Sequence, residues 1–442
     1  MMSAAQSQTL EDKLEALQCG FTWDLNPGRS KLLRLRDILE DIGTEEGNSW
    51  LGHIYNLRGY IQYKLGFTED SQSLFNQATE ALRLTRGAEE GPWLVVNYGN
   101  LAWLHHHLGK QEESQAYLSK VDALMKKYPS PSQDELHPEI LAEKAWTLMK
   151  FSAVQRLLAV VYFERAIRMQ PDMKEWNTSR VLAVMNASNY CNEGPEAGIL
   201  EEMKIAKEQD PENLYLAAKY LEQRGKKGES IEDEACELRT RVLINPVSSY
   251  SGMKVLLWVY RNYVSVDEAI TLAEEALEKH PDVRYLKSCV ALCYKWKIFS
   301  EDSHTNQPMI EKAISLHEEV INLYPHSSLV KKIDLANIYA KSSHSQAKAD
   351  QIFQELLESD LEPAEKQMLY HSYSNHLFFH LNDSDRATQY HMRAAEIPHK
   401  SFYRERSIRV LTQIRDRKKD RMWREIETFL SNLQGPQCFK KH

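Results

Sequence analysis

One pattern recurs along this chain and constrains its fold more than any other feature. After Lys150 come Ala159, Phe163, Ala166 and Pro171, at spacings of four, three and five residues. The same landmarks return at Tyr260, Ala269, Ala273, Ala276 and Pro281. Small residues at these spacings share a helix face and let a second helix approach closely, while the proline marks a helix end. The pattern therefore predicts a repeated helix–turn–helix unit of about 34 residues.

Weaker copies extend the array over most of the chain. They are Gly59, Phe75 and Ala78; Ala102, Gly109 and Val121; Ala313, Val320 and Pro325; Ala336, Tyr339, Ala349 and Phe353; and Phe378, Ala387 and Ala394. Roughly eight or nine tandem copies are typical of tetratricopeptide repeats, which bury their apolar faces against their neighbours. Low glycine and proline contents, 17 and 15 of 442 residues, disfavour a many-stranded protein. We predict an all-α tetratricopeptide-repeat superhelical solenoid.

Two irregular stretches divide the array. Residues 303–308 belong to an insertion of about ten residues relative to the repeat spacing. Residues 186–195 carry Asn, Gly and Pro, which predicts a loop. We expect about three sub-blocks, namely an N-terminal repeat block, a middle repeat block and a C-terminal repeat block, followed by a basic C-terminal helical segment. Their predicted bounds are 1–135, 136–245, 246–400 and 401–442.

The cellular compartment follows from the termini and the cysteines. The N-terminus has neither a basic region nor an apolar stretch of the kind found in signal peptides. The longest apolar run, 157–163, is far shorter than the roughly 20 residues that span a membrane. Six scattered cysteines do not resemble a disulfide framework. We expect a cytoplasmic protein that does not associate with membranes.

Catalytic and metal-binding patterns are weak. No glycine-rich phosphate loop, nucleophile elbow or zinc-protease motif occurs in the sequence. The candidate metal ligands are His105, His106 and His107 in a row, the pair His376 and His380, and the pair Cys289 and Cys293. Adjacent helical residues point about 100° apart, and each pair lacks the two further ligands that zinc would need. We expect no enzyme activity, no metal site and no cofactor.

The distribution of charge is more informative than its total. The net charge of −8 argues against a generally basic nucleic-acid binder. Between residues 400 and 424, however, ten basic and three acidic residues give +7, which leaves −15 for the remainder. The basic residues are Lys400, Arg404, Arg406, Arg409, Arg415, Arg417, Lys418, Lys419, Arg421 and Arg424. A basic helix at the end of an acidic solenoid indicates a polyanion site, unless acidic neighbours pair with it.

Aromatic and basic residues also coincide on predicted inner helices. Trp146 and Lys150 are four residues apart and hence on one helix face, where a ring and an ammonium can stack a base and hold a phosphate. A tryptophan at this repeat position is equally consistent with a core residue. Lys254 and Arg261 form a second basic pair two turns apart.

Several stretches of the sequence resemble those of a known family. Cys19-Gly-Phe-Thr-Trp23 is similar to the Cys-His-Phe-Thr-Trp motif of the interferon-induced proteins with tetratricopeptide repeats, the IFIT family. Further similar stretches are Tyr55-Asn-Leu57 with Lys64-Leu-Gly66, Tyr98-Gly-Asn-Leu-Ala-Trp103, Lys144-Ala-Trp-Thr-Leu-Met-Lys150 and Leu335-Ala-Asn-Ile-Tyr339. The similarity runs from about residue 10 to about residue 420, with drift. It suggests a divergent member with a shortened C-terminus, which stops roughly one repeat early.

The resemblance implies a function. Members of this family enclose a positively charged tunnel that captures the 5′ end of single-stranded viral RNA, bearing a triphosphate or an undermethylated cap. They thereby sequester foreign RNA as interferon-induced antiviral effectors of innate immunity, without catalysis. The implied partners are RNA 5′ ends and family paralogues or a second copy, but not DNA. The choice between triphosphate and cap stays open.

The resemblance also implies site residues. Lys150 matches a lysine that contacts terminal phosphates, and Trp146 matches a tryptophan that lines the pocket. Asn213 and Tyr215 match residues that read the first nucleotides. Lys254 occupies the position of a family arginine, and Arg156 occupies the position of a tyrosine that lines the tunnel. The sequence departs from the family pattern at Ile38, Ile42, Asn186, Ser288 and Cys289. Ile38 and Ile42 occupy positions where the family has polar or basic phosphate contacts, and Arg34 or Arg36 is the expected substitute for these contacts.

Two other hypotheses remain. The alternative function is a protein–protein scaffold without RNA binding, which is a common role of such repeats. We also expect exposed apolar residues at the C-terminal end to permit dimerisation, because a solenoid end needs a cover. These residues are Trp423, Ile426 and Phe429.

Overall fold

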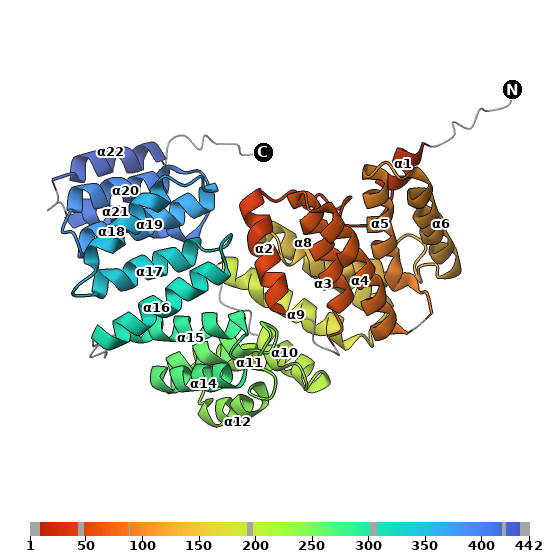
Figure 1. Cartoon of the computed structure of the whole chain (residues 1–442), viewed down its shortest axis with the longest axis horizontal. Coiled ribbons are helices and arrows are strands. Elements are labelled where there is room, and N and C mark those ends of the chain that lie inside the picture. Colours follow the sequence, from red (N-terminus) through yellow and green to blue (C-terminus); the bar gives the residue numbers. More distant parts are fainter. Residues whose placement is uncertain are drawn as a thin grey trace. The chain divides into compact units, whose positions relative to one another are not determined.

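The computed structural model describes residues 9–42, 48–87, 89–191, 198–300, 307–417 and 421–433. Within these ranges all regular secondary structure is helical and no strand occurs, which confirms the predicted all-α repeat fold (Figure 1). The chain forms two compact units, residues 1–286 and 287–442. The block bounds predicted from the repeat spacing near residues 135, 245 and 400 fall inside these units and stay a prediction.

The first unit contains the helices from α1 to α14 and the start of α15. Their bounds are α1 Leu10–Glu15, α2 Arg29–Ile42, α3 Leu51–Leu65, α4 Thr68–Arg86, α5 Val95–His107, α6 Gln111–Lys127, α7 Pro138–Leu148, α8 Ala153–Met169, α9 Lys174–Cys191, α10 Ile199–Gln209, α11 Leu214–Lys226, α12 Glu232–Val242, α13 Met253–Val259, α14 Val266–Lys279 and α15 Arg284–Ile298. A 3₁₀ turn (Pro92–Leu94) precedes α5, and a π-helical turn (Tyr260–Val264) follows α13.

Helix pairs in this unit pack as the repeat predicts. The pairs α3 with α4, α5 with α6, and α7 with α8 are in extensive contact. In the first pair Gly59 of α3 faces Phe75 of α4 so closely that an added Cβ would lie 2.6 Å from the ring. Ala159 and Ala166 of α8 are fully buried for the same reason. Small residues thus bring the helix axes together, and larger ones fill the space between them.

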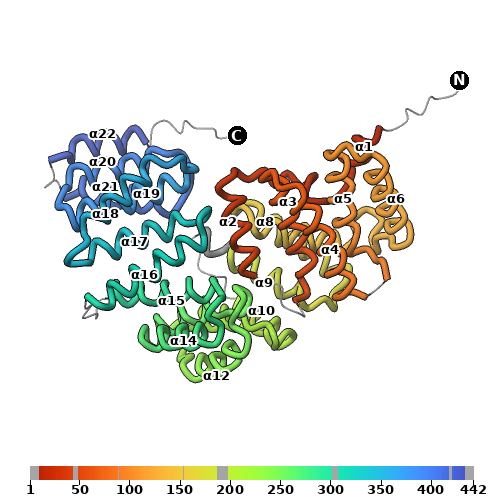
Figure 2. Tube along the Cα trace, in the orientation of Figure 1, coloured from red at the N-terminus to blue at the C-terminus, as the bar shows by residue number. Residues whose placement is uncertain are grey.

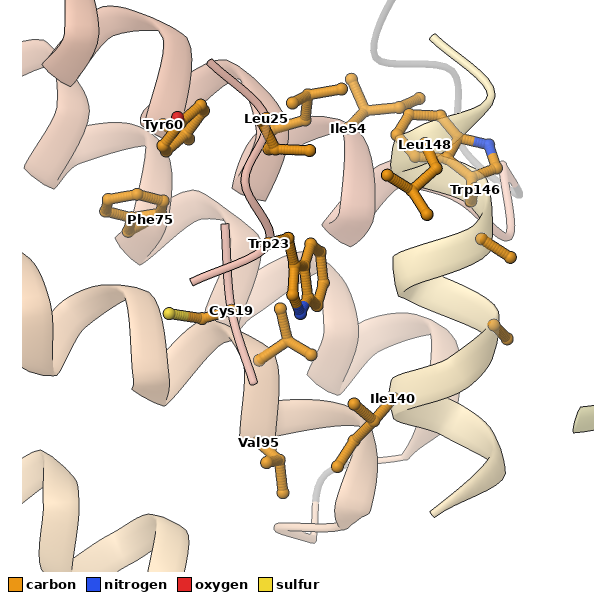
Figure 3. Packing of buried hydrophobic residues seen from close by; sticks show 14 of the residues in the cluster. Cys19, Trp23, Leu25, Ile54, Tyr60, Phe75, Val95, Ile140, Trp146 and Leu148 are labelled. Carbon is orange, nitrogen blue, oxygen red and sulfur yellow. The ribbon is translucent and has the colours of Figure 1, made fainter. Parts of the chain in front are cut away.

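One continuous apolar core runs from α1 to the start of α9. It includes the segment that carries the Cys19–Trp23 motif, and both of those side chains are buried. Figure 3 shows Trp23 pointing toward α7, from which Ile140 and Leu148 project. The motif therefore closes the N-terminal end of the repeat core, which explains why a short segment without long helices is so rich in large apolar residues.

The second unit continues from α15 with further helix pairs (Figure 2). Their bounds are α16 Gln307–Leu323, α17 Leu329–Lys341, α18 Gln346–Leu357, α19 Pro363–Phe379, α20 Ser384–Glu396, α21 Phe402–Arg417 and α22 Trp423–Leu433. Neighbouring pairs α17 with α18, and α19 with α20, are in contact, and Phe353 and Tyr373 are fully buried between them.

Two predictions about local structure need correction. The stretch 186–195 was expected to be a loop, yet α9 continues as far as Cys191. Residues 192–195 lie outside the described residues, as do 301–306 of the predicted insertion. Gln307 and Pro308, also assigned to the insertion, begin α16, since proline is favourable in a first helical turn.

The basic C-terminal segment is also not one helix. It forms α21 and α22, which pack on each other and on α20. Ile426, expected to be exposed, is fully buried with Leu411 and Leu430, while Trp423 and Phe429 are half-buried. Part of the apolar face proposed for dimerisation is therefore the internal core of this last helix pair. Lys418 and Lys419 lie outside the described residues.

No helix in the described ranges has both the length and the apolar character needed to cross a bilayer. In the same ranges no group of three or more His, Cys, Asp or Glu side chains is arranged to hold a metal ion.

Candidate nucleic-acid interface

A lysine between two aromatic rings forms the centre of the candidate site. Lys150 follows the C-terminal end of α7, and its Nζ lies 4.3 Å from the centroid of the Trp146 ring. The same Nζ donates a hydrogen bond of 3.0 Å to the hydroxyl of Tyr250 and lies 5.4 Å from that ring. Cation–π contact and the hydrogen bond together orient the ammonium, which remains half-buried. Such a cation can receive a phosphate without first searching among rotamers.

Trp146 itself belongs to the core beneath this lysine. Its side chain is 1% exposed and stacks on Trp50, with ring centroids 5.7 Å apart. Its indole Nε1 has no hydrogen-bond partner among the described residues. The sequence left open whether this ring is a core residue or a stacking surface, and the structure places it in the core with one face against Lys150.

Tyr250 was not predicted from the sequence. It lies in the segment between α12 and α13, and Tyr215 at the start of α11 stacks on it with centroids 5.6 Å apart. Burial raises the pKa of Tyr215 well above its ordinary value, so its hydroxyl remains neutral. An isolated tyrosine in an irregular segment carries no periodic signal, and only the three-dimensional structure reveals its contact with Lys150.

The segment that carries Tyr250 is fastened to α2. Ser248 donates from its hydroxyl to the backbone carbonyl of Ile42, and the backbone N–H of Ser249 donates to the carbonyl of Asp41 at 2.7 Å. Arg284, at the start of α15, also pairs with Asp41, with Nε 2.9 Å from the carboxylate. These contacts join elements more than 200 residues apart and bring α2 to the same side of the first unit as Lys150.

A second group of cations comes from α2 and α8. Lys31 and Arg34 are three residues apart and share a face of α2. The ammonium of Lys31 donates a long hydrogen bond of 3.5 Å to the carbonyl of Phe151, the residue after Lys150. Burial, and to a smaller extent the neighbouring charges of Arg34 and Arg156, lower the pKa of Lys31 from 10.5 to about 8. The arginine predicted at position 156 therefore joins a positively charged cluster.

Other predicted site residues are placed differently. Asn213 is the N-cap of α11: its Oδ1 accepts from the N–H of Leu216 at 3.0 Å, and its Nδ2 donates to Asp210 at 3.2 Å. Its polar atoms are thus used by the helix end. Lys254 and Arg261 lie exposed on α13 and the π turn, and Arg36 is half-buried on α2.

The departures from the family pattern also have distinct environments. Ile38 is 52% exposed on α2, whereas Ile42 is 2% exposed and belongs to the core. Asn186 is half-buried within α9. The substitution at position 42 is thus a core residue, and the one at position 38 leaves an apolar side chain at the surface.

These observations define a class of protein. The chain is a tetratricopeptide-repeat protein whose first unit gathers lysine, arginine and tyrosine side chains around the end of α7. A comparison with protein-family models found no match. Individual relatives nevertheless align over nearly the whole chain.

Human protein IFIT1 homolog B is 27% identical over 94% of this chain and 90% of its own length. Human interferon-induced protein with tetratricopeptide repeats 2 is 26% identical over 92% of this chain and 87% of its own. The solved human IFIT1 dimer with m7Gppp-AAAA has a TM-score of 0.73 at 25% identity, covering 97% of this chain and 96% of that one. The human IFIT1 dimer with PPP-AAAA gives 0.70, also at 25% identity, covering 96% of this chain and 95% of that one. Over nearly its whole length the chain is thus similar to the interferon-induced proteins with tetratricopeptide repeats.

Proposed function

We propose that this protein is an antiviral effector that binds the 5′ end of single-stranded RNA in a basic tunnel within the solenoid and sequesters it. The observation that carries this proposal is the ammonium of Lys150, held by the Trp146 ring and the Tyr250 hydroxyl. Solved relatives at 25% identity, human IFIT1 with PPP-AAAA and with m7Gppp-AAAA, support the choice of ligand.

Electrostatics favours an end of RNA over RNA in general. The chain carries −8 overall, so its average field repels a polyanion. The cations Lys31, Lys150 and Arg156 provide local attraction near the end of α7. A 5′ triphosphate concentrates more charge than any internal phosphodiester and gains most from such a site. The proposal also includes the remaining predicted RNA contacts, which are Tyr215, Lys254, Arg261 and Arg36. It includes Asn213 because this residue lies beside Tyr215.

The decisive experiment compares RNA ends in a gel-shift or fluorescence assay at fixed salt. We expect 5′-triphosphate RNA to bind more tightly than 5′-hydroxyl RNA of the same sequence. Lys150→Glu should reduce that affinity at least about tenfold, because it replaces an attraction by a repulsion. Lys126→Glu, on the exposed face of α6, makes the same change in net charge and is the matched control. Equal binding of both RNAs, or equal loss in both variants, would refute the site.

One observation favours the alternative scaffold function. Helix α8 exposes an apolar stripe at helical spacing, and its exposed fractions are 69% for Val154, 52% for Leu157, 47% for Leu158 and 49% for Val161. Such a stripe is typical of surfaces that bind proteins. The scaffold hypothesis predicts no discrimination between RNA ends in the assay above, and undiminished partner binding by Lys150→Glu.

Two further parts of the proposal concern location and assembly. We place the protein in the cytoplasm, which the free thiols of Cys19 and Cys236 support. The solved human IFIT1 relatives are described as dimers, so we also propose assembly with a second copy or a family paralogue. Light scattering of the purified chain tests this, and a concentration-independent monomer mass would contradict self-association.

A further inference from the structure

The first unit contains a pocket of about 230 Å³ that is separate from the Lys150 site. It is formed by the segment 21–26, which follows α1, and by the C-terminal ends of α3 and α5. Lys150 and Trp146 belong to the other end of α3, because Trp146 stacks on Trp50, the residue before the first turn of that helix. A helix of 15 residues is about 20 Å long. The two sites therefore lie at opposite ends of α3.

Four aromatic rings form one wall of this pocket. Phe21 stacks on Trp103 with ring centroids 6.1 Å apart, and it contacts the ring of Tyr63 at 5.0 Å. His107 stacks on Tyr63 at 5.2 Å and on Trp103 at 5.3 Å. Phe21, Tyr63 and Trp103 are half-buried and His107 is exposed, so the wall still presents aromatic surface to a ligand.

Hydrogen bonds hold this wall in position. Nε1 of Trp103 donates to the backbone carbonyl of Leu14 at 3.0 Å. The backbone N–H of Gly20, next to Phe21, donates to Oδ1 of Asn100 at 3.0 Å. Both bonds attach the N-terminal segment to α5. Rings that are already positioned lose little conformational entropy when a ligand stacks on them.

Several polar side chains of the pocket lack polar partners in the protein. Within the described residues no hydrogen bond or ion pair involves the side chains of Asp24, Asn26, Tyr60, Tyr63, Lys64 and His107. Tyr60 is only 4% exposed, and leaving a hydroxyl unpaired when it is nearly removed from water costs free energy. A ligand with complementary polar groups would remove that cost.

These groups match a planar base that carries a phosphate. Proteins bind unpaired bases by stacking them on aromatic rings, because every base has a π face. The carboxylate of Asp24 can only accept hydrogen bonds, and guanine presents two adjacent donors, N1–H and N2–H₂, on its Watson–Crick edge. Lys64 is exposed and supplies a positive charge for a phosphate. The pocket is smaller than the roughly 300–1,000 Å³ of sites for drug-sized ligands, so it suits a single base.

We propose that this pocket binds a guanine nucleotide. The base stacks on the wall that contains Phe21 and Trp103. Asp24 accepts hydrogen bonds from its N1–H and N2–H₂ groups, and Lys64 contacts the phosphate. The inference goes beyond the proposed function, because it requires neither a 5′ triphosphate nor Lys150. A free mononucleotide and an unpaired guanine of an RNA strand share this chemistry.

Calorimetric titration with guanosine 5′-monophosphate (GMP) tests the pocket. We expect GMP to bind about tenfold more tightly than adenosine 5′-monophosphate (AMP), because adenine presents a single donor beside an acceptor on the same edge. Asp24→Asn should abolish this preference, and asparagine tolerates the left-handed backbone at this position, where φ is 51°. Asp122→Asn, on the exposed face of α6, makes the same change in charge and is the matched control. Phe21→Leu should weaken GMP binding by about fivefold or more, since it removes a stacking ring.

Lys64→Gln separates the phosphate contact from the base contacts. This variant should bind GMP about fivefold more weakly than wild type, whereas its affinity for guanosine, which has no phosphate, should be unchanged. Lys126→Gln removes an exposed positive charge from α6 and should bind both ligands like wild type. Circular dichroism checks that every variant is folded.

Three results would overturn the inference. The first is that GMP does not bind, or binds no more tightly than AMP. The second is that Asp24→Asn and Phe21→Leu bind GMP as wild type does. The third is that Lys150→Glu loses GMP binding while Asp24→Asn retains it, which would place the nucleotide at the candidate RNA-end site. Failure of wild type to distinguish 5′-triphosphate from 5′-hydroxyl RNA would instead refute only the proposed function.

An oligonucleotide distinguishes the two sources of the base. A 5′-hydroxyl oligouridine with one internal guanine is compared with the same oligouridine without it. If the guanine increases the affinity and Asp24→Asn removes the increase, the pocket accepts a guanine of an RNA strand. If GMP binds but the guanine in the oligonucleotide has no effect, the pocket accepts the free nucleotide. Either result supports a guanine site.

Discussion

The hydroxyl of Tyr250 accepts a hydrogen bond from Nζ of Lys150 at 3.0 Å, although the two residues are 100 positions apart in the chain. This bond links the turn after α7 to the segment before α13. It holds the ammonium over the Trp146 ring, at 4.3 Å from the ring centroid. The orientation of the main candidate cation therefore depends on a residue from a different repeat.

Removing this hydroxyl tests that dependence. Tyr250→Phe keeps the ring and removes the acceptor of the hydrogen bond that the half-buried Lys150 ammonium donates. We expect binding of 5′-triphosphate RNA to weaken by about two- to tenfold, with the melting temperature nearly unchanged. Tyr250→Ala also removes the stacking partner of Tyr215 and should weaken binding more. Wild-type affinity in both variants would show that Tyr250 has no positioning role.

Salt dependence distinguishes phosphate contacts from other contacts. Each phosphate contact contributes about one unit to the slope of log affinity against log salt concentration. We therefore expect Arg156→Gln to reduce that slope by about one, measured by titration between 50 and 200 mM salt. If Arg156→Gln lowers the affinity but leaves the slope against salt concentration unchanged, Arg156 supports the structure and does not contact a phosphate.

A buried carboxyl makes the stability of the first unit depend on pH. Glu143 is 2% exposed, accepts from Nδ2 of Asn56 at 2.8 Å and lies 3.7 Å from Nε2 of His53. Burial raises its pKa from 4.5 to about 8. The folded-state pKa of Glu143 lies above its unfolded-state value of 4.5. The stability that the neutral Glu143 carboxyl contributes is therefore complete below pH 4.5 and is lost as the pH rises through 8.

Glu143→Gln preserves the shape and the acceptor for Asn56 but cannot ionise. We expect the free energy of unfolding to fall less between pH 5 and pH 8 in this variant than in wild type, by an amount on the order of a few kcal/mol. Glu139, whose pKa burial raises to about 7, retains part of the dependence in both proteins. Identical pH profiles in urea denaturation would contradict the assignment to Glu143.

The second unit has the opposite pH dependence. His371 and His391 are buried, and each Nδ1 lies within hydrogen-bond distance of Ser407 Oγ, at 3.1 and 3.2 Å. Burial lowers the pKa of His371 from 6.5 to about 4 and that of His391 to about 3. Folded-state pKa values below the unfolded ones mean that stability is full above pH 6.5 and is lost as pH falls toward 4.

Hydrogen exchange resolves this loss by helix. We expect amides of α19 to α21 to lose protection between pH 6.5 and pH 5, after correction for the intrinsic exchange rate. His391→Gln should reduce the pH dependence, whereas His399→Gln, an exposed residue before α21, should leave it unchanged. Equal behaviour of the two variants would rule out the buried histidines as the cause.

Gly252 provides a test of the packing that supports Tyr215. Its φ is 82°, and an added Cβ would lie 2.7 Å from the carbonyl oxygen of Leu214. Gly228 has the same backbone conformation, with φ at 81°, but open space around it. Gly228→Ala should cost about 1 kcal/mol from backbone strain alone. Gly252→Ala should cost at least about 2 kcal/mol, since α13 must also move away from α11.

RNA binding gives a second readout for the same pair. Gly252→Ala should weaken binding of 5′-triphosphate RNA, because the displaced segment carries the Tyr250 ring that Tyr215 stacks on. Gly228→Ala should bind like wild type. Equal destabilisation by both substitutions would contradict the proposed close approach.

Several parts of the site could be predicted, and others could not, for identifiable reasons. Trp146 and Lys150 were predictable neighbours because a spacing of four residues is a local property of a helix. Asn213 is the N-cap of α11, a role that an asparagine just before a helix favours, and its contact with RNA stays a prediction. The C-terminal basic residues were counted as one helix, although their chain folds into the pair α21 and α22.

The sequence by itself determined the repeat fold, because small residues, aromatic residues and prolines at fixed spacings specify helix pairs through short-range geometry. It also determined that positive charge is local in an acidic chain. Only the tertiary structure decided which cations meet. Lys31 reaches the carbonyl after Lys150 across 120 positions, and Ser248 reaches Ile42 across 206. A local sequence pattern cannot predict such contacts, because they depend on how successive repeats stack and on irregular segments that have no repeating pattern.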